Sequence, residues 1–154
     1  MCSLIRAATN FNLVPRGHGR GTFRLAETIQ VGSIPVHLFN DFPWIPYAGT
    51  YASVEAIGML GKVGQLHKIV KKIATITAND CNGTYIKEMR LKVLSIRHYY
   101  TIPGVMEQIK LFINDPLGPT GGLLRCAALH PNALEYFNTI TNVVGIPPIH
   151  PNWK

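Results

Sequence analysis

The chain of 154 residues is short of acidic side chains and of cysteine. Eight residues are Asp or Glu, against fifteen Lys or Arg, which gives a formal net charge of +7. The basic residues are spread along the chain without an arginine-rich tract, so we expect no nucleic acid partner. A small anion such as a nucleotide diphosphate suits this charge balance equally well. Three cysteines do not indicate a disulfide framework, and no apolar run approaches the length that spans a bilayer.

Metal-binding motifs are lacking as well. The six histidines and three cysteines form no His-x-x-x-His or Cys-x-x-Cys pair, the spacings typical of protein metal sites. No Asp-x-Asp occurs anywhere in the chain. We therefore expect neither a bound metal ion nor a cofactor.

The first forty residues have the pattern of a β–α–β unit. The apolar segment 11–15 ends at proline and glycine and predicts a buried strand. A helix is predicted over 22–31, ended by Gly32, and a second strand rich in branched and aromatic residues over 34–39. A helix between two strands at this spacing is typical of parallel pairing. The expected fold class is α/β, a small parallel sheet flanked by helices.

Three amphipathic segments follow and predict helices over 65–78, 84–100 and 101–115, the last of which stops before Pro116. Each carries an apolar stripe that we expect to face the core. The stripes are Leu66, Ile69, Val70, Ile73 and Ile76; Ile86, Met89, Val93, Ile96 and Tyr100; and Val105, Ile109 and Phe112.

The turn between the first strand and its helix is rich in glycine and arginine. Glycine lets the backbone approach a ligand closely, and the N–H groups that begin a helix favour an anion. Arg16 and Arg20 are placed to hold phosphate oxygens, and Glu27 to accept hydrogen bonds from ribose hydroxyls. The alternative is that Arg20, Arg24 and Glu27 form a solvated face with an i,i+3 ion pair. The spacing matches neither the Walker loop nor the G-x-G-x-x-G fingerprint.

The loop after the second strand holds further candidates. Asp41, Trp44 and Tyr47 follow the carboxyl end of that strand, where open α/β sheets bind ligands. An aromatic ring there either stacks on a base or sugar, or packs within a proline-rich surface loop. We expect His37, on the strand itself, to be structural or crevice-lining and not a base.

The segment 15–47 resembles exostosin-type glycosyltransferases, the family that includes heparan-sulfate and plant cell-wall enzymes. The matching residues begin with a Pro-Arg-Gly turn at 15–17 and Phe-Arg-Leu-x-Glu at 23–27. A Gly-x-Ile-Pro-Val run at 32–36, Asp41 and an aromatic-proline loop follow. The resemblance extends, less specifically, over most of 11–131.

The resemblance implies a Rossmann-like lobe of a two-lobed GT-B enzyme, the lobe that holds a UDP-sugar. It assigns Glu27 to the ribose and the basic residues Arg16, Arg20 and Arg24 to the diphosphate. The matched residues Gly17, Thr22 and Asp41 complete the expected donor site. The other large class of glycosyltransferases binds a metal ion and the diphosphate through an Asp-x-Asp motif. This chain lacks that motif, so metal-independent chemistry is expected. The catalytic base is unassigned and is expected in the acceptor-binding lobe.

The expected function is therefore transfer of a sugar from a UDP-sugar to a hydroxyl of an oligosaccharide or polysaccharide. Residues 1–131 would form the donor-binding lobe and 132–154 a proline-rich extension. The partner would be a separate N-terminal lobe, in the same polypeptide or in a second chain. The alternative is a non-catalytic module that binds a nucleotide or a protein partner. A typical family member would lie in the Golgi lumen, whereas the N-terminus as printed, if complete, would place the chain in the cytoplasm.

Overall fold

The first three elements form the parallel β–α–β unit that the sequence predicts. The computed structural model describes residues 9–17, 21–116 and 118–124. Strand β1 (Phe11–Pro15) is followed by helix α2 (Phe23–Gln30) and strand β2 (Ile34–Phe39). The strands pair in parallel, with Phe11 opposite Ile34 and Pro15 opposite Leu38. Gly32 has a φ of +70°, a left-handed conformation that favours glycine after a helix.

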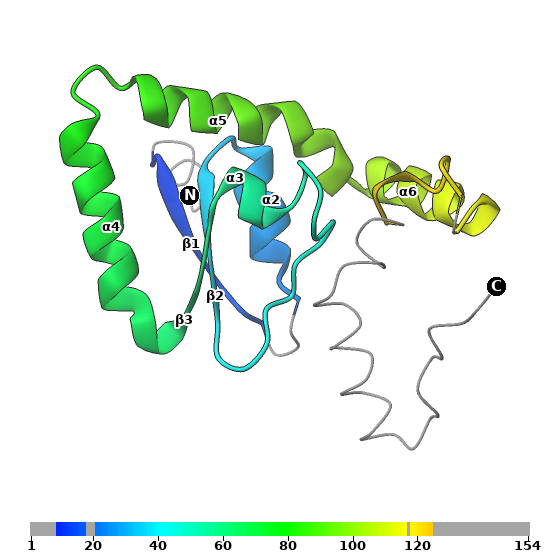
Figure 1. The fold of residues 1–154 in the computed structure, drawn as a ribbon, viewed down its shortest axis with the longest axis horizontal. Helices are drawn as coiled ribbons and strands as arrows, with labels where there is room; N and C mark the ends of the chain where they lie inside the picture. The colour runs from blue at the N-terminus through cyan, green and yellow to red at the C-terminus, as the bar shows by residue number, and fades with distance from the viewer. Residues whose placement is uncertain (1–8, 18–20, 117, 125–154) are drawn as a thin grey trace.

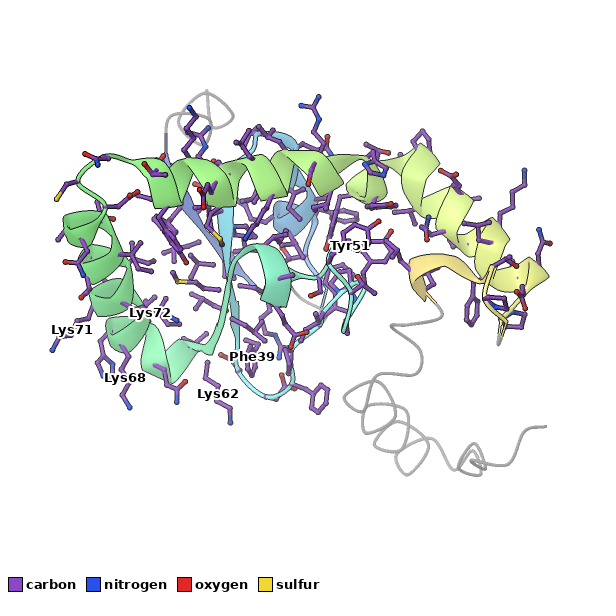
Figure 2. The ribbon with its side chains drawn as sticks, turned by 45° about the horizontal axis from the view of Figure 1, so that its top comes forward. Phe39, Tyr51, Lys62, Lys68, Lys71 and Lys72 are labelled. Atoms are coloured by element: carbon purple, nitrogen blue, oxygen red, sulfur yellow. The ribbon has the colours of Figure 1, made fainter. Side chains whose placement is uncertain are left out.

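A third strand completes the sheet, and the sequence did not predict it. The short helix α3 (Val54–Ile57) leads into strand β3 (Met59–Lys62), which pairs in parallel with β2. The sheet order is β1-β2-β3 (Figure 1). Phe39 and Lys62 are register partners at the carboxyl ends of their strands, and Figure 2 shows them at the same end of the molecule. A 3-10 turn, η1 (Val63–Gln65), then begins helix α4 (Leu66–Asn79).

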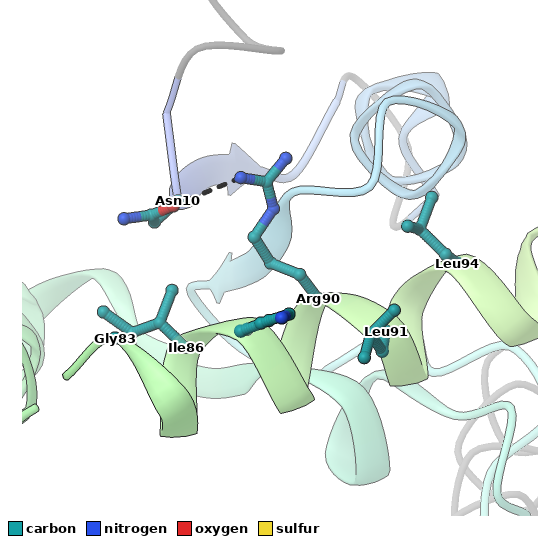
Figure 3. A pocket seen from close by; sticks show the side chains of 7 residues that line it. Asn10, Gly83, Ile86, Arg90, Leu91 and Leu94 are labelled. Carbon is teal, nitrogen blue, oxygen red and sulfur yellow. Dashed lines mark hydrogen bonds between the residues drawn. The ribbon is translucent and has the colours of Figure 1, made fainter.

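Helix α5 (Thr84–Ile96) crosses the opposite edge of the sheet, where the strands begin (Figure 1). Its Arg90 Nε donates a hydrogen bond to the carbonyl oxygen of Gly32, 3.0 Å away. Arg90 Nη1 donates to Oδ1 of Asn10 at 3.4 Å (Figure 3). Because Asn10 precedes β1 and Gly32 precedes β2, one guanidinium joins α5 to the starts of both strands.

The 3-10 turn η2 (Arg97–Tyr100) joins α5 to helix α6 (Ile102–Asn114), which extends away from the sheet (Figure 1). Side chains of α2, α3, α5 and β1 meet in one hydrophobic core. Its buried members are Val14, Leu25, Ile29, Tyr47, Ala52, Val54, Ile57, Val93, Ile96 and Tyr100.

Helices cover both faces of the sheet. Side chains alternate between the faces of a strand, and Leu60 of β3 packs against the core that α2, α3 and α5 share. The next residue, Gly61, faces the other side, where Ile69 of α4 stands so close that a Cβ on Gly61 would clash. Helix α4 therefore lies against β3 on the face opposite α2. The α/β class, with a small parallel sheet flanked by helices, is confirmed.

The apolar stripes predicted to be core have different outcomes. The stripe on α5 is confirmed, since Ile86, Val93, Ile96 and Tyr100 are buried. The prediction for α4 is wrong, because α4 has no buried residue and Val70 is 51% exposed. Among the described elements, α4 packs mainly against the short edge strand β3 and η1.

The prediction that the stripe on α6 faces the core is also wrong in part. Val105 is exposed, and the buried residues of α6 are Gly104 and Gln108. Helix α6 packs on η2 at Gly104, and its Gln108 Oε1 accepts a hydrogen bond from the backbone N–H of Leu123 at 2.7 Å, so its buried side faces η2 and the segment 118–124. None of the helices within the described ranges is long and apolar enough to cross a membrane. The expected division at residue 131 and the proline-rich tail lie outside the described residues.

Candidate functional site

The candidate site lies at the carboxyl edge of the sheet, and Arg16 is its best-placed cation. Arg16 follows β1 directly, and its backbone N–H donates to the carbonyl oxygen of Leu38 on β2 at 3.0 Å. Its Nη1 donates to Oδ1 of Asp41 at 2.8 Å, which makes a salt bridge. The ends of β1 and β2 are thus joined by one charged pair. The structure brings together two residues that the sequence assigned to the same site.

Close approach of the backbone requires glycine at position 17 of this turn. A Cβ on Gly17 would lie 2.9 Å from the carbonyl oxygen of Gly21, a distance that side chains do not tolerate. The turn therefore closes on itself before α2 begins. A Cβ on Gly21 would lie 3.6 Å from the ring of Trp44, so the turn also packs beside the loop after β2. Arg20, predicted to bind phosphate, lies outside the described residues.

Thr22 begins helix α2 as its N-cap. Its Oγ1 accepts a hydrogen bond from the backbone N–H of Arg24 at 3.2 Å. The first turn of α2 carries no acidic side chain, so its N–H groups keep their preference for an anion. Thr22 thus has an observed capping role in addition to its predicted place in the donor site.

Arg24 and Glu27 form the i,i+3 pair that the sequence offered as the alternative to ligand binding. Arg24 Nε and Glu27 Oε2 are 4.0 Å apart, and both side chains are about half exposed, 49% and 52%. An exposed pair at this distance contributes roughly 0–1 kcal/mol. A ligand hydroxyl would therefore displace the bond to Arg24 at little cost.

An apolar cavity of about 350 Å³ adjoins this end of α2. Phe23, 92% exposed, and Trp44, 41% exposed, line this cavity, and exposed aromatic rings of this kind can stack on a base or a sugar. Its lining is Gly21, Thr22, Phe23, Leu25, Ala26, Trp44 and Tyr100. A stacking role for Tyr47 is wrong, because Tyr47 is only 3% exposed and belongs to the core.

His37 is fully buried within β2 and does not line an open crevice. Its Nδ1 lies 3.2 Å from the carbonyl oxygen of Val14, to which it donates in the matching tautomer. Burial lowers the pKa of His37, and this effect outweighs the hydrogen bonds to the backbone of Val14 and Trp44, which raise it. A neutral, enclosed imidazole of this kind supports the structural alternative.

Hydrogen bonds between tyrosines and backbone carbonyls fix the loop after β2, an arrangement that the sequence did not predict. Tyr47 donates from its hydroxyl to the carbonyl oxygen of Tyr99 at 2.8 Å, and Tyr100 donates to that of Ala52 at 2.7 Å. The hydroxyls of Tyr51 and Tyr99 are 2.6 Å apart. This hydrogen bond, with burial second, raises the pKa of Tyr99 to about 12. The only signal in the sequence is the tyrosine pair at 99–100 and the tyrosines of the loop.

A second cavity, of about 420 Å³, lies at the opposite edge of the sheet (Figure 3). Arg90 and Lys87 are its charged groups, and Arg90 already donates hydrogen bonds to Gly32 and Asn10. Its lining is Asn10, Gly83, Ile86, Lys87, Arg90, Leu91 and Leu94. This cavity is separate from the residues that the sequence assigned to a ligand.

Within the described ranges, no three His, Cys, Asp or Glu side chains gather where they would hold a metal ion. Comparisons of the chain with family models, with curated proteins and with solved structures find no match.

Proposed function

We propose that the chain is the donor-binding lobe of a GT-B glycosyltransferase similar to exostosins. It would transfer a sugar from a UDP-sugar to a hydroxyl of an oligosaccharide or polysaccharide. The observation that carries this proposal is the position of Arg16, beside a glycine-closed turn and the N-terminus of α2, at the carboxyl edge of a parallel sheet. Ligands of open α/β sheets bind at this edge.

Arg16 and α2 would bind the diphosphate. A guanidinium has five N–H donors, and the bond to Asp41 uses one of them. The others, with the N–H groups of α2 and the predicted contribution of Arg20, would stabilise the charge that develops on the departing diphosphate. Asp41 would then orient Arg16.

Glu27 would accept hydrogen bonds from the ribose hydroxyls, in exchange for its weak pair with Arg24. The cavity between Phe23 and Trp44 offers space for the base or the sugar ring.

One observation favours the alternative of a non-catalytic module. The carboxylates at this edge, Asp41 and Glu27, both face arginines, and His37 is enclosed. A general base must reach the acceptor hydroxyl, and none of these three groups is placed to do so. A catalytic base would therefore have to come from the facing lobe.

Calorimetry with UDP and with uridine tests the site. Arg16→Ala should weaken UDP binding by about ten- to hundredfold, because it removes a charge-assisted hydrogen bond of roughly 1.5–3 kcal/mol. Uridine binding should weaken much less, because uridine has no phosphate. Glu27→Ala should weaken both ligands, because both carry the ribose. Arg97→Ala and Glu88→Ala, exposed residues on η2 and α5, are the matched controls. Dissociation constants that stay unchanged in Arg16→Ala and Glu27→Ala, with wild-type melting, would refute the site.

A transfer assay separates the enzyme from the binding module. UDP-sugars and mixed oligosaccharide acceptors are supplied to the chain together with the N-terminal lobe, because the catalytic base is expected there, and each assay is run with and without a chelator. Turnover that persists with the chelator supports a metal-independent transferase. Tight UDP binding without turnover supports the module.

A further inference from the structure

The cavity of about 420 Å³ at the edge where the strands begin lies between helix α5 and Asn10 (Figure 3). We call it the α5 cavity. Asn10 precedes β1, and the other lining residues belong to α5 or, for Gly83, to its N-cap. Arg16 follows β1 at the opposite edge, so a ligand in the α5 cavity would leave the candidate donor site open. Small-molecule sites have volumes of about 300–1,000 Å³, and the α5 cavity falls within that range.

Three side chains offer hydrogen-bond donors to the α5 cavity. The guanidinium of Arg90 donates from Nε to Gly32 and from Nη1 to Asn10, which uses two of its five N–H groups. Lys87 is exposed beside it and adds a second positive charge. Asn10 accepts from Arg90 through its amide oxygen, so its NH2 group is the part that can donate to a ligand. These donors and charges favour an anionic ligand.

No acidic residue lines the α5 cavity, and the two acidic residues of this region are directed elsewhere. The carboxylate of Asp80 accepts from the backbone N–H groups of Tyr85 and Ile86, at 3.0 and 2.9 Å, where α5 begins. At 100° per residue, Glu88 lies about 160° from Arg90 around the axis of α5. The lining itself is therefore positive, which raises the local concentration of anions.

Apolar side chains form the rest of the lining. Ile86 is buried, whereas Leu91 is 55% exposed and Leu94 is 37% exposed. Figure 3 shows Ile86 and Leu94 on either side of Arg90 along α5. An apolar group that lay on the two leucines would remove them from water, which is favourable. The α5 cavity thus combines a positive end with an apolar wall.

We propose that the α5 cavity binds a small amphipathic anion. Its carboxylate or phosphate head would lie on Arg90 and Lys87, and its apolar body on Leu91 and Leu94. A guanidinium can bind either head group through two parallel hydrogen bonds. The cavity has no aromatic side chain on which a nucleic acid base would stack. The proposal is independent of the proposed function, because no residue of the candidate donor site takes part.

Calorimetry and thermal unfolding of the full chain with four probes test the proposal. Octanoate and octyl phosphate carry both parts of the ligand, octanol lacks the anion, and acetate lacks the apolar body. We expect octanoate or octyl phosphate to bind at least about tenfold more tightly than octanol and acetate. The bound probe should also raise the melting temperature with its concentration. The tighter of the two anions identifies the head group.

Matched variants locate the bound anion. Lys87→Gln should weaken its binding about threefold to fivefold, whereas Lys92→Gln, which also lies exposed on α5 but outside the lining, should stay within about twofold. Leu91→Gln should weaken it about fivefold to tenfold. Val70→Gln on α4 is its control, because Val70 is 51% exposed and remote from the cavity. Arg90 stays unchanged, since it holds the starts of β1 and β2 and its loss would perturb the fold.

Three results would overturn the proposal. One is binding of both amphipathic anions that is no tighter than that of octanol or acetate. Another is an equal loss of affinity in the cavity variants and in their controls. The third is tighter binding to phosphatidylglycerol vesicles than to either soluble anion, with Leu91→Gln as the sensitive variant, which would make this face of α5 a membrane-binding surface.

UDP titration separates the α5 cavity from the candidate donor site. UDP should leave the affinity for the amphipathic anion unchanged, and Lys87→Gln should leave the UDP dissociation constant unchanged. Displacement of the anion by UDP would show that the anion had bound at the donor site, which would overturn the α5 cavity alone. Anion binding that depends on Lys87 and Leu91, in a chain that does not bind UDP, would overturn the donor site and leave the α5 cavity.

Discussion

The hydroxyl of Tyr100 should be a measurable source of stability. Tyr100 is 9% exposed, and its hydroxyl donates to the carbonyl oxygen of the fully buried Ala52 at 2.7 Å. Tyr100→Phe keeps the ring, which meets Tyr47 edge-on at a centroid distance of 5.5 Å. The variant therefore loses little packing but leaves a buried carbonyl without this donor. That loss should lower the free energy of unfolding by about 1–3 kcal/mol.

Tyr51→Phe removes the same group in a different environment. Tyr51 is 58% exposed, and water can replace its hydrogen bond to Tyr99. The expected loss is within about 0.5 kcal/mol. Urea unfolding of both variants at pH 7 measures the difference, provided that the m-values agree. Equal losses in the two variants would refute the argument from burial.

The same pair of variants tests the pKa of Tyr100. Burial raises the pKa of Tyr100 above its usual value. The unfolded chain releases this proton near pH 10, while the folded chain keeps it. The contribution of protonated Tyr100 to the free energy of unfolding is therefore complete below pH 10 and is lost as the pH rises further. Relative to wild type, both variants should show a smaller fall in stability above pH 10, Tyr100→Phe because Tyr100 no longer titrates and Tyr51→Phe because Tyr99 loses the hydrogen bond that raises its pKa.

Two further predictions concern the candidate site and its support. Thr22→Ala removes the N-cap of α2 and should cost about 0.5–2 kcal/mol in urea unfolding, with Thr22→Ser close to wild type. Burial lowers the pKa of His37, so the unfolded chain takes up a proton below its ordinary pKa of 6.5 and the folded chain does not. Stability should therefore fall from pH 7 to pH 5, and His37→Gln should reduce that slope; an unaltered slope would assign the effect to other groups.

The β–α–β unit could be predicted from the sequence because its signals are local. Each signal depends on neighbouring residues alone. These signals are the short apolar segment that ends at Pro15, the helix that Gly32 ends, and the strand rich in branched residues over 34–39. The approach of Arg16 to Asp41 also follows, since parallel strands bring their carboxyl ends to one edge.

The remaining features depend on contacts that are distant in sequence. Strand β3 has four residues, too few for periodicity, and it exists because β2 pairs with it. The stripe of α4 has the amphipathic pattern of a core helix, but a pattern does not reveal that its partner is a short edge strand. Tyr47 occupies an aromatic-proline loop that is typical of a surface, yet Tyr99 and Tyr100 enclose it.

The charges at the candidate site lead to one more prediction. Each described arginine there faces a carboxylate, Arg16 with Asp41 and Arg24 with Glu27, so the two pairs add no net charge. Asp41 therefore orients Arg16 but also repels an incoming diphosphate. Asp41→Asn separates these effects, because an amide oxygen can still accept from Nη1 while the negative charge is removed.

We expect Asp41→Asn to bind UDP more tightly. Two charges about 4 Å apart in a watery environment interact by about 1 kcal/mol, which corresponds to roughly fivefold in affinity. Asp41→Ala removes the charge and the acceptor together, so Arg16 gains freedom and the benefit should shrink. Uridine, which has no phosphate, should bind all three proteins equally. A weaker UDP complex in Asp41→Asn would mean that the carboxylate itself contacts the ligand, and the assignment of Asp41 as the residue that orients Arg16 would fail.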